Sequence, residues 1–462
     1  MSDNIIVTAV GDRIENTLVE EFQGGLRGPL LRPESDGYEA ARKLWNGMFD
    51  RRPALIARCA GTADVIRAVN FARDHRLHVA VRGGGHSFPG HSICDGGLLI
   101  DLSAMKGIRV DPAARRAQAQ PGVKWIDFDH ETQAFGLATS GGTVSDTGIA
   151  GLTLGGGLGW LSSKHGLTVD NFLSADVVTA DGRLVTANAA ENPDLFWALR
   201  GGGGNFGIVT SFEYQLHAVG PTVVGGMILY PLSQAKEVLR FYRDFTKTTP
   251  DELTIYAGFV TPPGGETVVA LICCYCGPLG EGEEAVRPFK SLGTPVHDAL
   301  GPLPFVAQQQ IFDAGFPTGS NYYAKAASLG DLTDEAIEIL IEYAATMPSP
   351  LSGMVIQTVF GAASRVAPDA TAFRPRAFPY APIIVSQWLD PAQTAENVAW
   401  ARDCWGALQP FAGGVYVNDL GENDEDRVPA AYGANYQRLA ALKKKYDPDN
   451  FFRLNPNIKP AN

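Results

Sequence analysis

The segment from Arg82 to Ser87 constrains this chain more than any other, because it places three consecutive glycines and a histidine directly after an apolar, strand-like run, Leu77 to Val81. Glycine has no side chain and tolerates positive φ, so the backbone N–H groups of such a loop can converge on a phosphate. Arg82 adds positive charge, and the neutral imidazole of His86 is a competent nucleophile. The pattern predicts an anion-binding loop, and a tight turn with a surface histidine is the alternative.

Three further glycine clusters lie in the first half of the chain, at Gly141-Gly142, Gly148 to Gly159 and Gly201 to Gly207. Loops that expose this much backbone predict a long, phosphate-bearing ligand threaded between elements. No cluster ends in Gly-Lys-Ser/Thr, which argues against a nucleoside triphosphate. The strand-like run Leu98 to Leu102, and not a helix, follows the first loop, which argues against a Rossmann fingerprint.

Motifs along the whole chain resemble the vanillyl-alcohol-oxidase type flavoproteins, specifically the berberine-bridge-enzyme-like oxidases with a PCMH-type FAD-binding domain. They are Arg82 to Ser87, Gly148 to Gly159, Gly166 to Asn171, Asp194 to Val209, Tyr446 to Phe452 and Asn455 to Ile458. Because the matches fall near both ends, the resemblance covers nearly all of the chain except a divergent middle.

The resemblance implies an FAD whose 8α carbon is bonded to His86. Some members add a second bond from a cysteine four residues before the glycine of a Gly-Ile/Val-x-Gly turn. Here that position, before Gly148, is Val144, so we expect no cysteinyl link, and we interpret Cys94 as a small buried hydrophobe. The expected cofactor-binding residues are Arg82, Gly83, Gly84, Gly85, His86, Ser87, Gly142, Thr143, Gly148, Gly151, Gly155, Gly156, Gly207, Ile208 and Asn455.

The expected fold class is α+β, with a discontinuous FAD-binding domain. Residues 1–217 should form its first part, residues 218–414 a substrate-binding domain, and residues 415–462 a segment that returns to the first domain. In the first part we expect a helix capped by Thr62, a helix over 123–134 and a hairpin turn at Asp181-Gly182. The substrate-binding domain should be an antiparallel sheet of strands 227–230, 254–260, 268–275, 354–360 and 383–388, covered on the face away from the flavin by helices 233–246, 334–346 and 391–408.

Oxidation by a flavin typically moves a hydride to flavin N5 and a proton to a base, so a proton acceptor is needed. Tyr416 and Asn418 should lie on one side of a strand, because strand side chains alternate. The resemblance makes Asn418 the nearest counterpart of a Glu or Gln that faces the flavin, although an amide cannot act as a base. Tyr432 matches a tyrosine that helps to deprotonate an alcohol in relatives and is our candidate base; packing at a domain junction is the alternative.

Four residues are candidates for the substrate pocket: Phe88, Tyr323, Lys325 and Trp388. Phe88 stands where several relatives carry an active-site tyrosine. The other three lie on strand-like segments of the middle region, which should present alternate side chains to the cavity. Each of them could instead belong to the core, and Lys325 could be a solvated surface residue.

The expected function is therefore an FAD-dependent oxidase of a small organic alcohol or amine, with molecular oxygen as electron acceptor. A carbohydrate oxidase that forms a lactone, a dehydrogenase with another acceptor, and a redox-silent flavin-binding protein are the alternatives. The sequence does not report the oligomeric state.

Composition excludes several other classes. The formal charge of −12, without a basic run, argues against nucleic acid and anionic membranes as partners, and no apolar run is long enough to span a bilayer. Cys273, Cys274 and Cys276 lie in an apolar strand without the second Cys/His pair of a zinc site, so we expect no metal. Six cysteines do not suggest a disulfide framework, and with no recognisable secretory signal the expected location is the cytoplasm.

Overall fold

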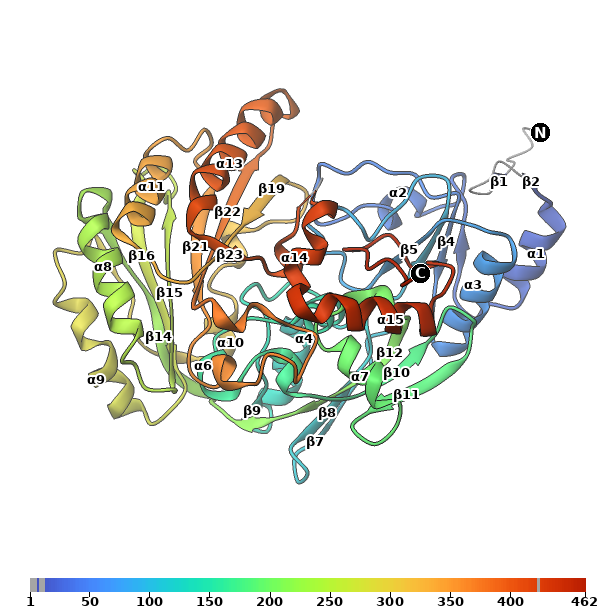
Figure 1. Ribbon diagram of the computed structural model, residues 1–462, viewed down its shortest axis with the longest axis horizontal. Coiled ribbons are helices and arrows are strands. Elements are labelled where there is room, and N and C mark those ends of the chain that lie inside the picture. The colour runs from blue at the N-terminus through green and yellow to red at the C-terminus, as the bar shows by residue number, and fades with distance from the viewer. Residues whose placement is uncertain (1–5, 8–12, 422–423) are drawn as a thin grey trace.

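The computed structural model describes residues 6–7, 13–421 and 424–462, which form two lobes along the long axis of the molecule (Figure 1). The first lobe contains a four-stranded and a five-stranded sheet, and the second lobe contains a ten-stranded sheet with its helices. Helices thus accompany largely antiparallel sheets, and the predicted α+β class is confirmed.

The four-stranded sheet carries the first glycine loop. Its strands run in the order β3 (Leu30–Leu31), β4 (Leu55–Arg58), β6 (Leu98–Asp101) and β5 (Val79–Arg82). Strands β4, β6 and β5 are parallel and mostly buried, as expected for parallel strands covered on both faces. Since β5 ends at Arg82, residues 83–87 leave the sheet at its carboxyl edge, where open parallel sheets bind ligands.

Helix α3 (Thr62–Asp74) connects β4 to β5 and contacts both β6 and β10 of the neighbouring sheet. The prediction that Thr62 caps this helix is wrong, because Thr62 is itself helical and its side chain makes no capping bond. The carboxylate of Asp64 instead accepts backbone N–H groups of Arg27 (2.8 Å), Gly28 (3.0 Å) and Ala60 (2.8 Å). An acidic residue in the first turn thus ties the start of the helix to a neighbouring loop.

The five-stranded sheet is antiparallel. Its order is β11 (Leu184–Asn188), β10 (Phe172–Val178), β12 (Ile208–Gln215), β8 (Arg116–Ala119) and β7 (Ile108–Asp111). Strands β10 and β11 form the expected hairpin, with Gly182 at φ +79° in its turn. Helices α4 (Trp125–Gln133), α5 (Ile149–Gly155) and α7 (Pro193–Leu199) accompany the sheet.

The second lobe is the ten-stranded sheet with helices packed on one face. Its strands are β17 (His297–Asp298), β14 (Thr222–Pro231), β16 (Val268–Tyr275), β15 (Leu253–Val260), β21 (Gly353–Thr358), β22 (Tyr380–Trp388), β20 (Ser328–Leu329) and β23 (Ala412–Gly414), with β18 (Gly301–Pro304) beside β14 and β19 (Asn321–Ala326) beside β22. Its large helices are α8 (Ala235–Thr246), α9 (Leu279–Lys290), α11 (Asp334–Ala345) and α13 (Thr394–Leu408). These helices cover the outer face in Figure 1 and leave the other face toward the first lobe.

Polar contacts join the lobes. Gln309, on α10 (Phe305–Gln309), donates to the buried Asp129 of α4 at 2.8 Å. The backbone N–H and hydroxyl of Ser145 both donate to Asp313, at 2.8 and 2.5 Å. The inner face of the second lobe is thereby held against the loops of the first.

After β23 the chain returns to the first lobe through α14 (Val428–Tyr432) and α15 (Tyr436–Tyr446) (Figure 1). The fully buried Lys443 donates to the carbonyls of Asn205 and Phe452, both at 2.8 Å, and to Asp447 at 2.6 Å. The side chain of Asn205 bonds Pro456 (3.0 Å) and Ile458 (2.9 Å). The last residues of the chain are thus bonded to the fourth glycine cluster.

Shorter elements complete the two lobes. They are β1 (Ile6–Val7), β2 (Arg13–Ile14), β9 (Leu137–Ala138), β13 (His217–Ala218), α1 (Asn16–Gly24), α2 (Tyr38–Ala41), α6 (Ser162–His165) and α12 (Ala362–Arg365).

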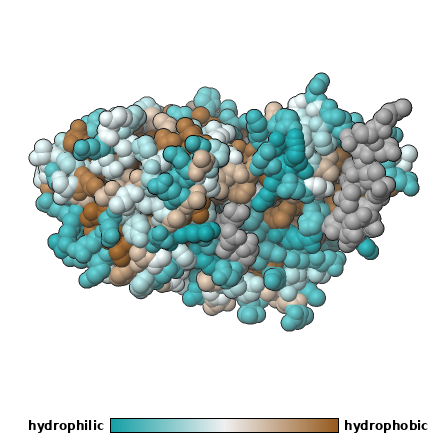
Figure 2. All heavy atoms as spheres, turned by 90° about the horizontal axis from the view of Figure 1, so that it is seen from above, coloured by the Kyte–Doolittle hydropathy of each residue, from teal (hydrophilic) through white to brown (hydrophobic). Residues whose placement is uncertain are grey.

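Hydrophilic residues spread over the length of the face shown in Figure 2, with smaller hydrophobic groups between them.

Candidate active site

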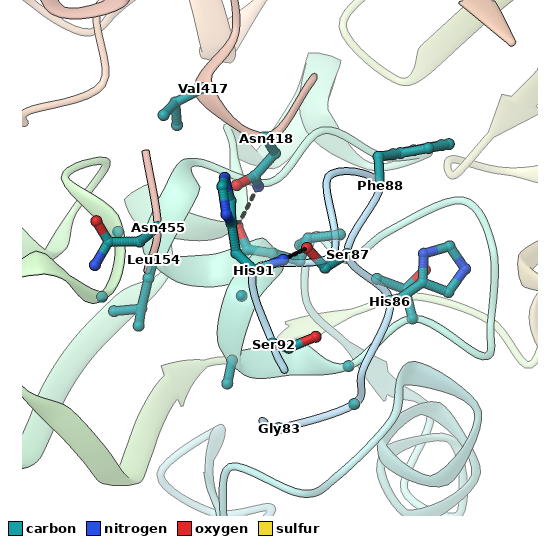
Figure 3. Close-up of a pocket in the computed structure, with 18 of the residues that line it drawn as sticks. Gly83, His86, Ser87, Phe88, His91, Ser92, Leu154, Val417, Asn418 and Asn455 are labelled. Carbon is teal, nitrogen blue, oxygen red and sulfur yellow. Dashed lines mark hydrogen bonds between the residues drawn. The ribbon is translucent and has the colours of Figure 1, made fainter. Parts of the chain in front are cut away.

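A cavity of about 390 Å³ lies between the glycine loops of the first lobe and the inner face of the second. This is within the range of small-molecule and cofactor sites. In Figure 3, Leu154 and Asn455 lie on one side of it, His86 and Phe88 on the other, and Val417 and Asn418 come from the chain that returns from β23. The cavity is therefore extended and draws its walls from distant parts of the sequence.

Two glycine loops meet at its floor with their backbones in contact. A Cβ added to Gly84 would lie 2.5 Å from the Cα of Gly148, so neither position accepts a larger residue without movement. Beside Gly151 and Gly204, by contrast, an added Cβ would meet nothing within 4 Å, although both residues line the cavity. These loops leave exposed backbone and open space where an elongated ligand would lie.

His86 lines the cavity, and its buried Nε2 has no hydrogen-bond partner among the described residues. Its ring stacks on Trp45, with centroids 3.8 Å apart, and in Figure 3 it is turned away from Asn418. Burial lowers the pKa of the ring to about 4, with a smaller opposing effect of Asp146. At neutral pH His86 is therefore an uncharged imidazole with an unused buried nitrogen. Trp45, which holds this ring, was missed because nothing in its own segment suggests a site.

The expected cofactor residues divide into those that line the cavity and those that do not. Those that line it are Gly83, Gly84, Gly85, His86, Ser87, Gly142, Thr143, Gly148, Gly151, Gly207, Ile208 and Asn455. Val144 also lines it, whereas Cys94 is buried among the side chains of the four-stranded sheet. Ser92, which the sequence did not suggest, contributes a buried hydroxyl without a partner among the residues described.

Arg82 does not line the cavity. It is paired with Asp101, with Arg82 Nη2 2.7 Å from Asp101 Oδ2 and Nε 3.2 Å from Oδ1. The two residues are register partners at the ends of the parallel strands β5 and β6. The charge of Arg82 is therefore used within the sheet, and the expectation that it binds the ligand is corrected.

Gly155 and Gly156 do not line the cavity either, because other side chains fill the space beside them. A Cβ on Gly155 would lie 2.0 Å from Asn418 Oδ1, and one on Gly156 would lie 2.4 Å from the ring of Phe373. Both glycines make room for packing across the site and do not face the open space.

Tyr416 and Asn418 meet, but not as neighbours on a strand. Strand β23 ends at Gly414, and Val417–Asp419 form a 3-10 turn, η8, in which the N–H of Asp419 donates to Tyr416 O (3.0 Å). The hydroxyl of Tyr416 accepts from Asn418 Nδ2 and from the N–H of Gly157, both at 2.7 Å. The turn, and not strand alternation, brings these side chains together at the cavity.

Tyr432 lies at the end of α14 and is only 1% exposed. It lines the cavity, and its hydroxyl has no hydrogen-bond partner among the described residues. Burial raises its pKa well above the usual value. A buried hydroxyl without a partner is costly in a folded protein, and this one is positioned to bond a ligand.

Asp419, which the sequence analysis did not single out, also lines the cavity and is 7% exposed. Its Oδ2 has no hydrogen-bond partner within the described part of the chain, and burial raises its pKa to about 7. An acidic residue that directly follows Asn418, itself a predicted site residue, was the available signal.

Of the four substrate-pocket candidates, only Phe88 lines the cavity. Tyr323, Lys325 and Trp388 face the opposite side of the sheet, which corrects that expectation. Tyr323 accepts a bond from Arg402 (2.9 Å), Lys325 is buried in an ion pair with Asp424 (2.5 Å), and Trp388 donates to Thr394 (3.1 Å). The sequence predicted that side chains along these strands alternate between the two faces of the sheet. It did not predict which of them face the cavity.

The second lobe supplies a largely apolar wall, formed in part by strand residues whose side chains point to the cavity side of the sheet. Ile383 and Val385 of β22 alternate with Ile384, which packs against the helices. The lining residues contributed by this lobe are Phe312, Phe316, Val355, Gln357, Ile383 and Val385. Within the described residues, none of the cavity-lining side chains is a lysine or arginine.

The described residues contain no cluster of three or more His, Cys, Asp or Glu side chains suited to a metal ion. They also contain no helix with the length and hydropathy needed to cross a bilayer.

Comparison with known proteins agrees with this geometry. Residues 53–188 match a family described as an FAD binding domain, and residues 415–459 match one described as berberine and berberine like. An FAD-linked oxidoreductase of Dictyostelium discoideum is 34% identical, over 96% of this chain and 97% of its own.

Solved structures are similar over nearly the whole chain. 6-Hydroxy-D-nicotine oxidase from Arthrobacter nicotinovorans superposes with a TM-score of 0.85 at 29% identity, covering 94% of this chain and 98% of its own. Xylooligosaccharide oxidase from Myceliophthora thermophila, in complex with xylobiose, gives 0.84 at 25% identity, covering 96% and 99%.

Proposed function

The chain belongs to the berberine-bridge-enzyme-like FAD-linked oxidoreductases, and we propose that it oxidises a small organic amine or alcohol with an FAD bonded covalently to His86 alone. The observation that carries the covalent part is the buried, uncharged His86, whose Nε2 is without a partner among the described residues at the cavity wall. Val144 at the position of a linking cysteine supports a single bond.

The residues present fit an FAD. The contact of Gly84 with Gly148 and the open space beside Gly151 and Gly204 leave backbone available to a dinucleotide without side chains in its way. Asn455, whose buried Oδ1 lacks a partner among the described residues, lies on the far side of the cavity from His86 (Figure 3). When bound, FAD supplies the two-electron acceptor that no side chain can provide.

The division of the chain follows from this arrangement. We propose residues 1–217 and 415–462 as the FAD-binding part and residues 218–414 as the substrate-binding part. The ten-stranded sheet begins with β14 at Thr222 and ends with β23 at Gly414, which supports these boundaries.

Tyr432 is the proposed proton acceptor of the substrate. A hydroxyl in the cavity wall with no described partner can hydrogen-bond a substrate group, and it accepts the substrate's proton once its own proton has passed to solvent, a loss that burial opposes because it raises the pKa of this hydroxyl. Tyr416 is less suited to this role, because its hydroxyl is already bonded by Gly157 and Asn418. We propose that Tyr416 and Asn418 position the wall of the site.

The lining of the second lobe supports a small organic substrate over an oligosaccharide. Phe312, Phe316, Val355, Ile383 and Val385 are apolar, as is Phe88 of the first lobe, and Gln357 is the polar residue that the second lobe adds. A sugar needs many hydrogen-bonding partners, since each buried hydroxyl left without one costs free energy. The solved hydroxynicotine oxidase is a similar protein whose name denotes a small organic substrate.

The covalent bond can be tested directly. Denatured protein should retain one FAD mass on the peptide that contains His86, and the flavin of His86→Ala should be removed by acid precipitation. A flavin that stays attached to His86→Ala would refute the assignment.

The substrate class and the electron acceptor require a second experiment. Under anaerobic conditions, small amines or alcohols should bleach the bound flavin, and xylo- or chito-oligosaccharides should not; the reverse result would favour a carbohydrate oxidase. Rapid reoxidation by air is expected of an oxidase. Reoxidation only by an added dye would indicate a dehydrogenase.

We also propose a cytoplasmic location. All six cysteines are buried and free, which suits a reducing compartment. Detection of the protein in the cytosolic fraction of its host would support this, and recovery from the medium would contradict it.

A further inference from the structure

Asp419 is a buried carboxylate in the cavity wall that is not neutralised by any partner described. It is the last residue of η8 and follows Asn418 directly. Its side chain is 7% exposed, it lines the cavity, and its Oδ2 accepts no hydrogen bond from the described residues. The proposed oxidation, as derived above, does not use it.

The elements packed against η8 do not provide a cation for this carboxylate. Helix α5 contains no charged residue. Strand β19 contributes Lys325, but its ammonium is paired with Asp424 at 2.5 Å, and Arg427 also pairs with Asp424 at 3.4 Å. Lys325 and Arg427 are thus already bound to another acid, and the cavity lining described contains no lysine or arginine; its basic residues are the histidines His86, which burial keeps uncharged at neutral pH, and His91.

The polar residues of the same turn do not supply a cation to Asp419 either. Tyr416 is an acid of the same turn whose hydroxyl is already bonded by Gly157 and Asn418, and the charge of Asp419 adds to the effect of burial in raising the pKa of Tyr416. A buried carboxylate without a counter-charge is expensive. A cationic ligand would remove that cost, and groups left in this state mark functional sites.

We propose that Asp419 binds the ammonium group of the substrate, so that the cavity selects an amine which enters in its protonated form. This inference rests on the proposed oxidase function and narrows its substrate class from amines and alcohols to amines. The apolar wall of the second lobe then holds the hydrocarbon part of the substrate, and Asp419 supplies the single charge that recognises its nitrogen.

Binding to the holoenzyme tests this without turnover. Three matched pairs would be titrated anaerobically at pH 8 into holoenzyme whose FAD has first been reduced with dithionite, so that the ligand cannot be oxidised: benzylamine with benzyl alcohol, piperidine with tetrahydropyran, and pyrrolidine with tetrahydrofuran. Calorimetry reports the dissociation constants. We expect the amine of at least one pair to bind about tenfold or more tightly than its oxygen counterpart, the usual size of a charge-assisted hydrogen bond.

The variant Asp419→Asn keeps the shape of the side chain and removes its charge, so this preference should fall close to one. Asp419→Glu should restore part of it. Asp129→Asn is the matched control, because Asp129 is another buried acid but does not line the cavity, and its variant should keep the preference of the wild type.

Equal binding within every pair, or no binding by any amine, would overturn the proposal, as would a preference that survives in Asp419→Asn. Equal binding is also the result expected if Asp419 only accepts a hydrogen bond from FAD. Failure of the oxidase proposal is distinguishable, since in that case no donor bleaches the flavin whatever the binding preference.

Discussion

The substitution Asp129→Asn should stabilise the protein above neutral pH. Asp129 is 1% exposed, and burial raises the pKa of its carboxyl from the usual 3.8 to about 7, although the bond from Gln309 opposes the shift. The folded state therefore holds this proton more tightly than the unfolded chain, and stability is lost as the pH rises from about 4 to about 7. A shift of roughly three pKa units at about 1.4 kcal/mol each gives an upper limit of about 4 kcal/mol at pH 8.

An asparagine keeps the carbonyl oxygen that accepts the Gln309 amide and removes the charge. We expect Asp129→Asn to raise the free energy of unfolding at pH 8 by about 1 to 4 kcal/mol and to change it far less at pH 5. The assay is denaturant unfolding of the holoprotein at both pH values, followed by tryptophan fluorescence. Because a chain with two lobes need not unfold in one step, the pH dependence of the difference from wild type is the quantity to compare.

Asp64→Asn is the control with the opposite sign. Burial opposes ionisation of Asp64, but backbone N–H groups, including those of Arg27, Ala60 and Gly28, outweigh it and lower the pKa of its carboxyl. Its substitution should destabilise the protein equally at pH 5 and pH 8, since the carboxylate is ionised throughout. An equal effect of Asp129→Asn at the two pH values, or a loss at pH 8, would refute the reasoning.

Three further predictions concern the cavity. His86→Ala should retain a folded, yellow protein whose flavin is released by acid, as measured by absorbance of the supernatant. Tyr432→Phe should slow anaerobic flavin reduction about 100-fold or more without unfolding the protein, because the hydroxyl bonds no described residue; an unchanged rate would exclude Tyr432 as the base. Gly84→Ala should lower the FAD content of purified protein, because its Cβ would lie 2.5 Å from Gly148, whereas Gly24→Ala, with open space around it, should not.

Much of the fold could be predicted from local patterns. The buried strand β16 was placed correctly from its apolar run, and α11 was placed correctly from Asp334 onward by its helical spacing. The turn after β23 could not be seen, because Tyr416 to Asn418 fits a strand equally well and only tertiary contacts bend it.

The sequence predicted the parts of the site that depend on close backbone contacts. It did not predict the parts that depend on which side of a sheet a side chain faces. Gly84 and Gly148 could be predicted to allow close contact between backbone segments, because glycine has no side chain. In the strand at residues 322–326, successive side chains must point to opposite faces of the sheet. Which set faces the cavity depends on the pairing with β22, where Tyr323 is the register partner of Ser386 and Lys325 of Ile384. The ion-pair partner of Arg82 could not be predicted either, since Asp101 lies 19 residues away on a neighbouring strand.

The bonds between Asn205 and the segment at Pro456 and Ile458 have a consequence for biogenesis. A ribosome delivers Gly84 hundreds of residues before Asn455, yet both border the same cavity. The enclosed cavity is therefore complete only after translation has passed the final helix, and a shorter polypeptide lacks the wall that Asn455 and Pro456 provide.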